Sequence, residues 1–288
     1  MTEPTTHTLN MPGAVLHYDV RSHRASGEPT LLLFGSPIEA AAFTALAGHF
    51  TDRTVVTHDP RGAGRSKRTD GAPQTSVEEH VADLHQLITQ VSRDPVDVFA
   101  TSGGAMNALA LVARHPDQVR IMVAHEPPAA QELPDRAAVL AACDAIKQTY
   151  LREGYGPGMA KFIALVSLLG PIPAGFADQP APDPATFGLP TVDDGTREDA
   201  LLCLNMPSCP AYRLDFTALL AAPTRIVVAI GAESGDALPG RGATAVAARL
   251  GTTPVVFPGG HTGFRATGPG GKSEADQFAT TLRRVLAG

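Results

Sequence analysis

Short apolar runs and longer amphipathic stretches alternate along the 288 residues of the chain. A continuous apolar run such as 30–34 is typical of a strand covered on both faces in a parallel sheet. The stretch 77–92 repeats its apolar residues at three- and four-residue spacing, which predicts a helix with one buried face. Predicted strands lie at 14–20, 30–34, 54–58, 119–124, 224–230 and 253–257, and a further strand begins at Val98. Predicted helices lie at 39–49, 77–92, 105–113, 135–152, 159–169, 243–250 and 274–286.

Strands that alternate with helices favour an α/β fold around a mostly parallel sheet. At the N-terminal end, a turn at Pro12-Gly13 predicts an opening hairpin. The alternation stops after about residue 128 and resumes at Thr224, and in between proline and alanine become frequent. The segment 171–190 is predicted to be a long loop. We therefore expect an insertion into the α/β core in this region.

Composition and charge narrow the class of partner. Hydrophobic residues make up 43% and charged residues 18% of the chain, as in a soluble globular protein able to bury a sizeable core. The 23 Lys and Arg residues against 29 Asp and Glu residues give a formal net charge of -6. Because phosphate-binding surfaces are normally basic, we expect neither nucleic acid nor a membrane as partner. A small-molecule substrate is favoured, and a homodimer stays open.

The remaining sequence signals predict a cytoplasmic protein without cofactor or metal. The N-terminus shows no basic segment followed by an apolar one, and no run is long enough to span a bilayer. Three cysteines, Cys143, Cys203 and Cys209, form no C-x-x-C pair, so we expect reduced, packed thiols. Gly62-Ala63-Gly64 is followed by Lys67 where a dinucleotide-binding motif needs its third glycine, and the chain contains no phosphate-loop motif.

The strongest chemical signal is a serine between a predicted strand and a predicted helix. Ser102 stands at the break between the run from Val98 and the helix from Ala105. Ala100 and Gly104 flank it, and small residues there let the helix pack back on its strand. The pattern is a nucleophile elbow, G-x-S-x-G, with alanine in place of the first glycine. Its plain structural alternative is a glycine-rich turn with an incidental serine.

Four segments together resemble the α/β-hydrolase superfamily, and the resemblance covers nearly the whole chain apart from the insertion. They are 31–37, 59–66, 100–105 and 257–264. The resemblance implies a mostly parallel eight-stranded sheet flanked by helices, with a helical cap inserted after the sixth strand. We accordingly expect an α/β-hydrolase core at 1–128 and 219–288 and a cap at 129–218.

The same resemblance implies a catalytic triad. Ser102 would be the nucleophile and His261 the base, since His261 follows the last predicted strand and glycines at 259 and 260 let its loop bend inward. In the loop after the predicted strand 30–34, Ser36 fits one oxyanion donor, and Gly103 after the nucleophile fits the other.

The acid of the triad has two candidate positions. Most relatives carry it after the seventh strand, where this chain has Ser234, with Glu233 and Asp236 as neighbours. Glu126, at the end of the sixth predicted strand, is favoured instead, because adjacent strands lie about 4.8 Å apart and could bring it to the same histidine as Ser102. Some haloalkane dehalogenases and the fungal zearalenone lactonases carry their acid there, and residues 121–128 resemble those of the lactonases.

These assignments predict a serine hydrolase that cleaves a carboxylic ester or lactone through an acyl-enzyme. The insertion supplies several aromatic residues and methionines, so its pocket is predicted to be apolar. Two other classes remain open: a non-hydrolytic enzyme of the same fold, such as a cyclase, lyase or acyltransferase, and a binding protein that lacks turnover.

Overall fold

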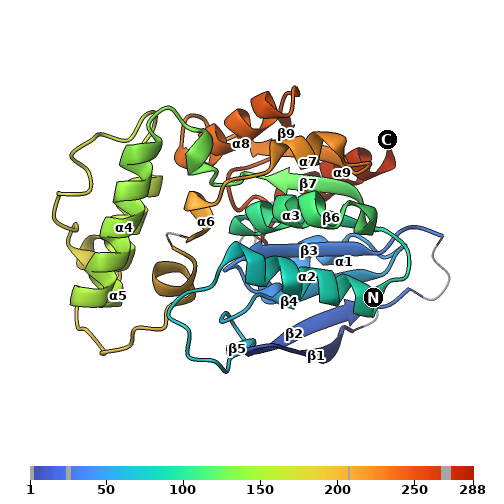
Figure 1. Ribbon diagram of the computed structural model, residues 1–288, viewed down its shortest axis with the longest axis horizontal. Coiled ribbons are helices and arrows are strands. Elements are labelled where there is room, and N and C mark those ends of the chain that lie inside the picture. The colour runs from blue at the N-terminus through green and yellow to red at the C-terminus, as the bar shows by residue number, and fades with distance from the viewer. Residues whose placement is uncertain (1–2, 24–26, 207, 267–273) are drawn as a thin grey trace.

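A nine-stranded sheet crosses the protein and carries helices on both faces (Figure 1). The computed structural model describes residues 3–23, 27–206, 208–266 and 274–288. The described strands are β1 Thr5–Met11, β2 Ala14–Arg21, β3 Leu31–Ser36, β4 Val55–Asp59, β5 Lys67–Arg68, β6 Val96–Ser102, β7 Val119–His125, β8 Arg225–Gly231 and β9 Val255–Phe257. The described α-helices are α1 Thr44–Gly48, α2 Val77–Val91, α3 Gly103–Arg114, α4 Arg136–Glu153, α5 Tyr155–Val166, α6 Ser208–Ala211, α7 Phe216–Ala221, α8 Leu238–Arg249 and α9 Glu274–Ala287.

The strand order is β1-β2-β4-β3-β6-β7-β8-β9. β1 and β2 form the predicted hairpin, and β2 also runs antiparallel to β4. The six strands β4, β3, β6, β7, β8 and β9 run parallel to one another. Parallel strands place their carboxyl ends at one edge of the sheet, so the residues that follow β3, β6 and β7 lie close together.

Alternate residues of the central strands enter two different cores, as the two-residue period of a strand requires. Val98, Ala100 and their counterparts on neighbouring strands pack under α2, α3, α7 and α8. Phe99 and its counterparts pack under α1 and α9. Both faces are therefore covered, which explains why the strands read as continuous apolar runs.

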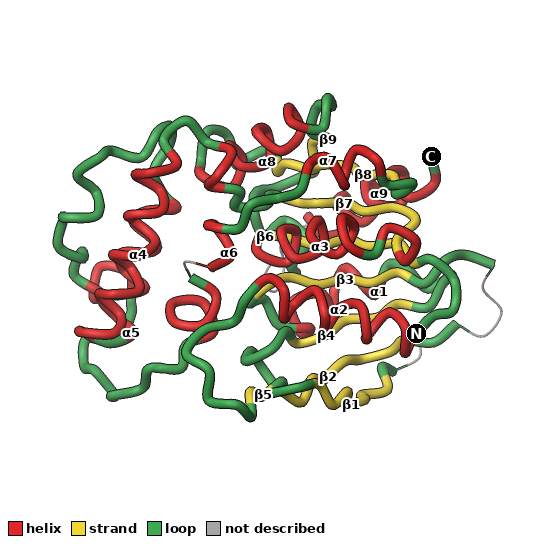
Figure 2. The backbone as a smooth tube through the Cα atoms, in the orientation of Figure 1, coloured by secondary structure: helices red, strands yellow, loops and turns green. Residues whose placement is uncertain are grey.

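Most of the segment between β7 and β8, including α4 and α5, lies beyond the carboxyl ends of the strands (Figure 2), whereas α7 packs on the sheet. The part beyond the strand ends has its own apolar cluster. Its helices α4 and α5 pack together through Val139, Ile146 and Leu165, among others. A six-residue π-helix, Ala200–Asn205, follows a long stretch dominated by loops and leads back toward the sheet. We refer to residues 129–218 as the inserted segment, and its division from the core at those boundaries stays a prediction.

Several predicted elements differ in detail from the structure. The expected eight strands become nine because Lys67–Arg68 pairs with Ala14 and Val15 of β2, a two-residue strand too short to give a pattern. The predicted helix 39–49 is a 3₁₀ turn, Ala40–Phe43, followed by the short α1. The start of α2 agrees with the sequence, and Ser76 and Glu79 form a capping box there. No helix in the described part of the chain is both long and apolar enough to cross a membrane.

Substituting Gly104 is expected to destabilise the fold, because helix α3 begins against the end of β3. A Cβ at position 104 would lie 2.7 Å from the Gly35 Cα and 3.1 Å from the Ser36 backbone nitrogen. Gly104→Ala should lower the free energy of unfolding by about 1–3 kcal/mol in urea denaturation, since backbone has to move. Gly175→Ala, where the added Cβ meets nothing within 4 Å, is the matched control and should change it by less than about 0.5 kcal/mol. Equal effects of the two substitutions would refute the steric explanation.

Candidate active site

Ser102 joins β6 to α3 in a backbone conformation that side chains rarely adopt. Its φ is 57° and its ψ is -134°, so the chain turns sharply and the side chain leaves the sheet. A Cβ at position 103 would lie 2.6 Å from the Ser36 carbonyl oxygen, which explains why glycine follows the serine. Ala100 is fully buried between Phe34 and Ala124 on the neighbouring strands. The small residues of the predicted elbow are therefore required by close contacts.

Glu126 directly follows β7 and is also held at positive φ, here 49°. Its side chain is buried, with both carboxylate oxygens hydrogen-bonded. Oε1 accepts from the Gly231 backbone N–H at 2.8 Å, and Oε2 lies 2.6 Å from Nδ1 of His261. Burial alone would raise the pKa of this carboxyl, but the bond from His261 and the nearby imidazoles of His125 and His261 lower it to about 2. Glu126 is therefore ionised at neutral pH.

His261 reaches Glu126 from the loop that follows β9. Gly259 adopts a φ of 75°, and a Cβ on Gly231 would lie 2.7 Å from the Gly259 carbonyl oxygen, so both glycines allow the loop to approach β8. Because Nδ1 donates to the ionised Glu126, the unprotonated nitrogen of the neutral ring is Nε2. Such a nitrogen is able to accept a proton from a nearby hydroxyl.

Neither of the two alternative acids is hydrogen-bonded to His261 in the described structure. The side chains of Glu233 and Asp236 are exposed, and Glu233 lies on the wall of a cavity. Ser234 takes the place where most relatives carry the acid. Its hydroxyl is buried and adds to the groups that lower the pKa of Glu126. Of the three candidate carboxylates, Glu126 is the one hydrogen-bonded to His261.

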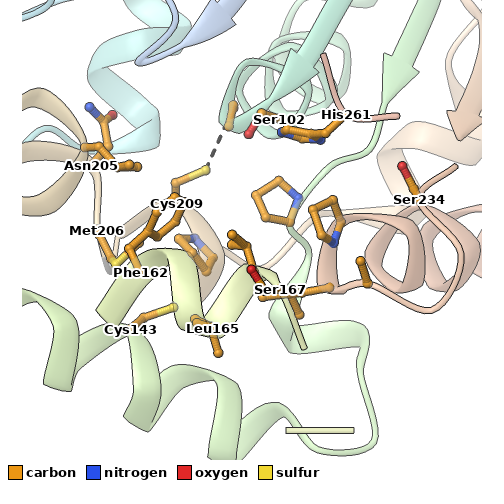
Figure 3. A pocket seen from close by; sticks show the side chains of 18 of the residues that line it. Ser102, Cys143, Phe162, Leu165, Ser167, Asn205, Met206, Cys209, Ser234 and His261 are labelled. Atoms are coloured by element: carbon orange, nitrogen blue, oxygen red, sulfur yellow. Dashed lines mark hydrogen bonds between the residues drawn. The ribbon is translucent and has the colours of Figure 1, made fainter. Parts of the chain in front are cut away.

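A cavity of about 500 Å³ lies between the strand ends and the inserted segment (Figure 3). Ser102, His261 and the two predicted oxyanion residues, Ser36 and Gly103, all line it, and the Ser102 and His261 side chains lie next to each other at its edge. Most of its wall is apolar and includes Phe162, Leu165, Val166, Leu169, Leu201, Met206 and Leu238. The expectation of an apolar pocket lined by the insertion agrees with this cavity.

A second, more open groove of about 630 Å³ adjoins the cavity and reaches the same pair of residues. It shares Ser102 and His261 with the cavity and also contacts Phe162 and Leu201. Its outer wall includes Ile38, Glu39, Ala42, Thr262 and Arg265. Ser102 and His261 therefore stand where the cavity and the groove meet.

Within the described ranges, no group of three or more His, Cys, Asp or Glu side chains is arranged to hold a metal ion. The three cysteines are free thiols, and all three are buried. Burial raises the pKa of Cys143 and of Cys209 to about 12, so both remain protonated at neutral pH.

Comparison with known proteins places the chain in a family. The family model described as the alpha/beta hydrolase fold matches residues 33–164. The uncharacterized hydrolase YraK of Bacillus subtilis (strain 168) is 33% identical over 265 residues, which cover 89% of each chain. The chain belongs to the α/β-hydrolase family.

Solved structures of other α/β-hydrolases share the fold at low sequence identity. A thermophilic esterase from Thermogutta terrifontis superposes with a TM-score of 0.65 at 20% identity, over 99% of this chain and 98% of that one. The enol-lactonase from Burkholderia xenovorans LB400 superposes with a TM-score of 0.59 at 18% identity, over 98% of this chain and 100% of that one.

Two polar residues of this α/β-hydrolase site escaped sequence reasoning. His80 on α2 is buried, and its Nε2 lies 2.8 Å from Oδ1 of Asn205. Asn205, on the wall of the cavity, had drawn no attention. A signal for His80 exists, because it follows Val77 by three positions and precedes Leu84 by four, on the buried face of α2. No local pattern marks Asn205.

The low pKa of Glu126 predicts a pH-dependent contribution to stability. A carboxyl with a pKa of about 2 when folded and about 4.5 when unfolded stabilises the fold fully above pH 4.5, and this contribution is lost as pH falls toward 2. The shift corresponds to about 3 kcal/mol. Glu126→Gln should therefore flatten the fall in unfolding free energy below pH 4.5, measured by urea denaturation from about pH 6 to about pH 3. Asp236→Asn, an exposed carboxylate near the site, is the control, and an unchanged acid slope in Glu126→Gln would contradict the assignment.

Proposed function

We propose that the protein is a serine hydrolase that cleaves a carboxylic ester or lactone of an apolar small molecule through an acyl-enzyme. The observation that carries the proposal is the buried, ionised Glu126 bonded to His261, whose ring lies beside Ser102 at the edge of an apolar cavity. A hydrolase relative and the esterase and enol-lactonase of the same fold support this reaction class.

In the proposed reaction, Nε2 of His261 takes the proton of the Ser102 hydroxyl as Oγ attacks the substrate carbonyl carbon. Glu126 stabilises the imidazolium that forms and keeps Nδ1 protonated. The backbone N–H groups of Gly103 and Ser36 stabilise the oxyanion. Collapse of the tetrahedral intermediate breaks the bond to the leaving alkoxide, which takes the proton from His261. Water, activated by the same ring, then hydrolyses the acyl-enzyme and regenerates the serine.

The surroundings of Ser102 favour an apolar acyl group. The cavity contains both proposed oxyanion donors, Ser36 and Gly103, so the carbonyl oxygen and the acyl chain belong on that side. Burial of the acyl chain against these apolar walls contributes about 25 cal/mol to the binding free energy for each Å² removed from water. The inserted segment supplies Phe162, Leu165 and Met206 to this wall, and we propose that it acts as a cap over the substrate.

Ser102→Ala is expected to abolish ester hydrolysis. With p-nitrophenyl esters of short, medium and long acyl chains, kcat should fall at least about 10⁴-fold, because alanine lacks the hydroxyl that forms the acyl-enzyme. Ser92→Ala, in which the lost hydroxyl bonds only to its own turn, is the control and should keep full turnover. Equal release of p-nitrophenol by wild type and Ser102→Ala would refute the hydrolase mechanism and favour a non-hydrolytic or binding role.

The acid assignment predicts opposite outcomes for two isosteric variants. Glu126→Gln should lower kcat about 10²- to 10⁴-fold, because a neutral amide cannot stabilise the imidazolium. Asp236→Asn should stay within about twofold of wild type, since its side chain is exposed and is not the carboxylate bonded to His261. Steady-state kinetics on the preferred p-nitrophenyl ester measure both, and the reverse result would move the acid to the loop after β8.

A further inference from the structure

The side chain of Asn205 links the inserted segment to Ser36, at the end of the proposed oxyanion strand β3. Asn205 is the last residue of the π-helix Ala200–Asn205, and it is buried. Its Oδ1 lies 3.3 Å from the Ser36 Oγ and 2.8 Å from Nε2 of His80. One amide oxygen of the inserted segment thus contacts both the end of β3 and the helix α2.

The directions of these hydrogen bonds follow from a neighbouring carbonyl group. The amide nitrogen of Asn205 lies 2.6 Å from the backbone oxygen of Ala200, which can only accept. This contact fixes the orientation of the amide, so its oxygen faces Ser36 and His80 and accepts from both. Burial lowers the pKa of His80 to about 4, in spite of its bond to Asn205, so the ring is neutral and carries its proton on Nε2. The Asn205 amide thus forms its hydrogen bonds to Ser36, His80 and Ala200 at the same time.

Further bonds hold the same turn against the core. The Thr75 backbone N–H donates to the Leu204 carbonyl oxygen at 2.7 Å. The Ser208 hydroxyl lies 2.8 Å from the Thr75 carbonyl oxygen and 2.9 Å from that of Asn205. The π-helix is therefore anchored just before α2 begins, on the side of the sheet where Ser36 ends β3. π-Helices are rare, and they often occur at functional sites.

Ser36 also lies against the elbow. It pairs in register with Ser102, and its carbonyl oxygen is the atom that a Cβ on Gly103 would strike. A shift of Ser36 by a fraction of an ångström would therefore change the distance between the two proposed oxyanion donors. Such donors act only when they lie within hydrogen-bond distance of the oxyanion.

We propose that Asn205 is a positioning residue, which acts through the Ser36 hydroxyl to hold the oxyanion donor of β3 in place when the inserted segment is seated on the core. The proposal rests on the function proposed above. It links the fit of the inserted segment to the rate of the chemical step, and it gives the buried His80 a role as the second donor that fixes the amide.

A double-mutant cycle tests the proposal on a p-nitrophenyl ester that wild type hydrolyses. Ser36→Ala keeps the backbone N–H but removes the hydroxyl, and Asn205→Ala removes its acceptor. Each single variant should lower kcat about 10- to 100-fold, less than the loss of a whole oxyanion donor, with KM changed less than about threefold. Because both remove the same contact, the double variant should lie within about threefold of the worse single variant. Ser36→Thr, which keeps a hydroxyl, should restore most of the activity.

Two controls separate positioning from stability and from the function itself. Asn107→Ala truncates a similarly buried amide on α3 that has no hydrogen bond to Ser36 among the described residues, and it should leave the split between kcat and KM unchanged even if the melting temperature falls. Multiplicative losses in the double variant, or a loss confined to KM, would overturn the role of Asn205 while Ser102→Ala still abolishes turnover. Full turnover by Ser102→Ala would instead overturn the proposed function, and the role of Asn205 with it.

Discussion

The burial of the Glu126 carboxylate is the constraint on which the site depends. An ionised carboxylate without exposed surface is tolerated only when hydrogen-bond donors replace the water it has lost. Here the donors are a backbone N–H at the end of β8 and the ring of His261 from the loop after β9. The need to hydrogen-bond the Glu126 carboxylate therefore fixes the ends of β7 and β8 and brings the loop of His261 against them.

Close backbone contacts also position the residues of the site. Helix α3 starts against β3 without room for a Cβ at Gly103 or Gly104, and the loop of His261 closes over β8 without room for one at Gly231. These contacts place Ser102, the end of β3 and His261 around one cavity. The inserted segment adds the apolar wall and the amide of Asn205. The sheet and its loops thus position Ser102 and His261, while the inserted segment forms the apolar wall of the pocket.

Most of the fold could be predicted from the sequence, because strands buried on both faces and amphipathic helices leave strong local patterns. Ser102 and His261 could be singled out as candidates, since each stands beside glycines at the end of a predicted strand, and both line the cavity. Glu126 required a choice between two strand ends, and the position adjacent to β6 agrees with the contact to His261. The contact between His80 and Asn205 could not be predicted, because 125 residues separate them and a contact over that distance leaves no periodic signal in the sequence.

The strained backbone at Ser102 and Glu126, both with positive φ, costs free energy during folding and not during each catalytic cycle. Each such conformation costs about 1–3 kcal/mol for a residue with a side chain, and both occur directly at the ends of buried central strands. The packing of the sheet meets this cost once, when the chain folds. For the proposed chemistry, the serine and the carboxylate then need no reorientation in each catalytic cycle, so the entropy of bringing them together does not enter the activation barrier.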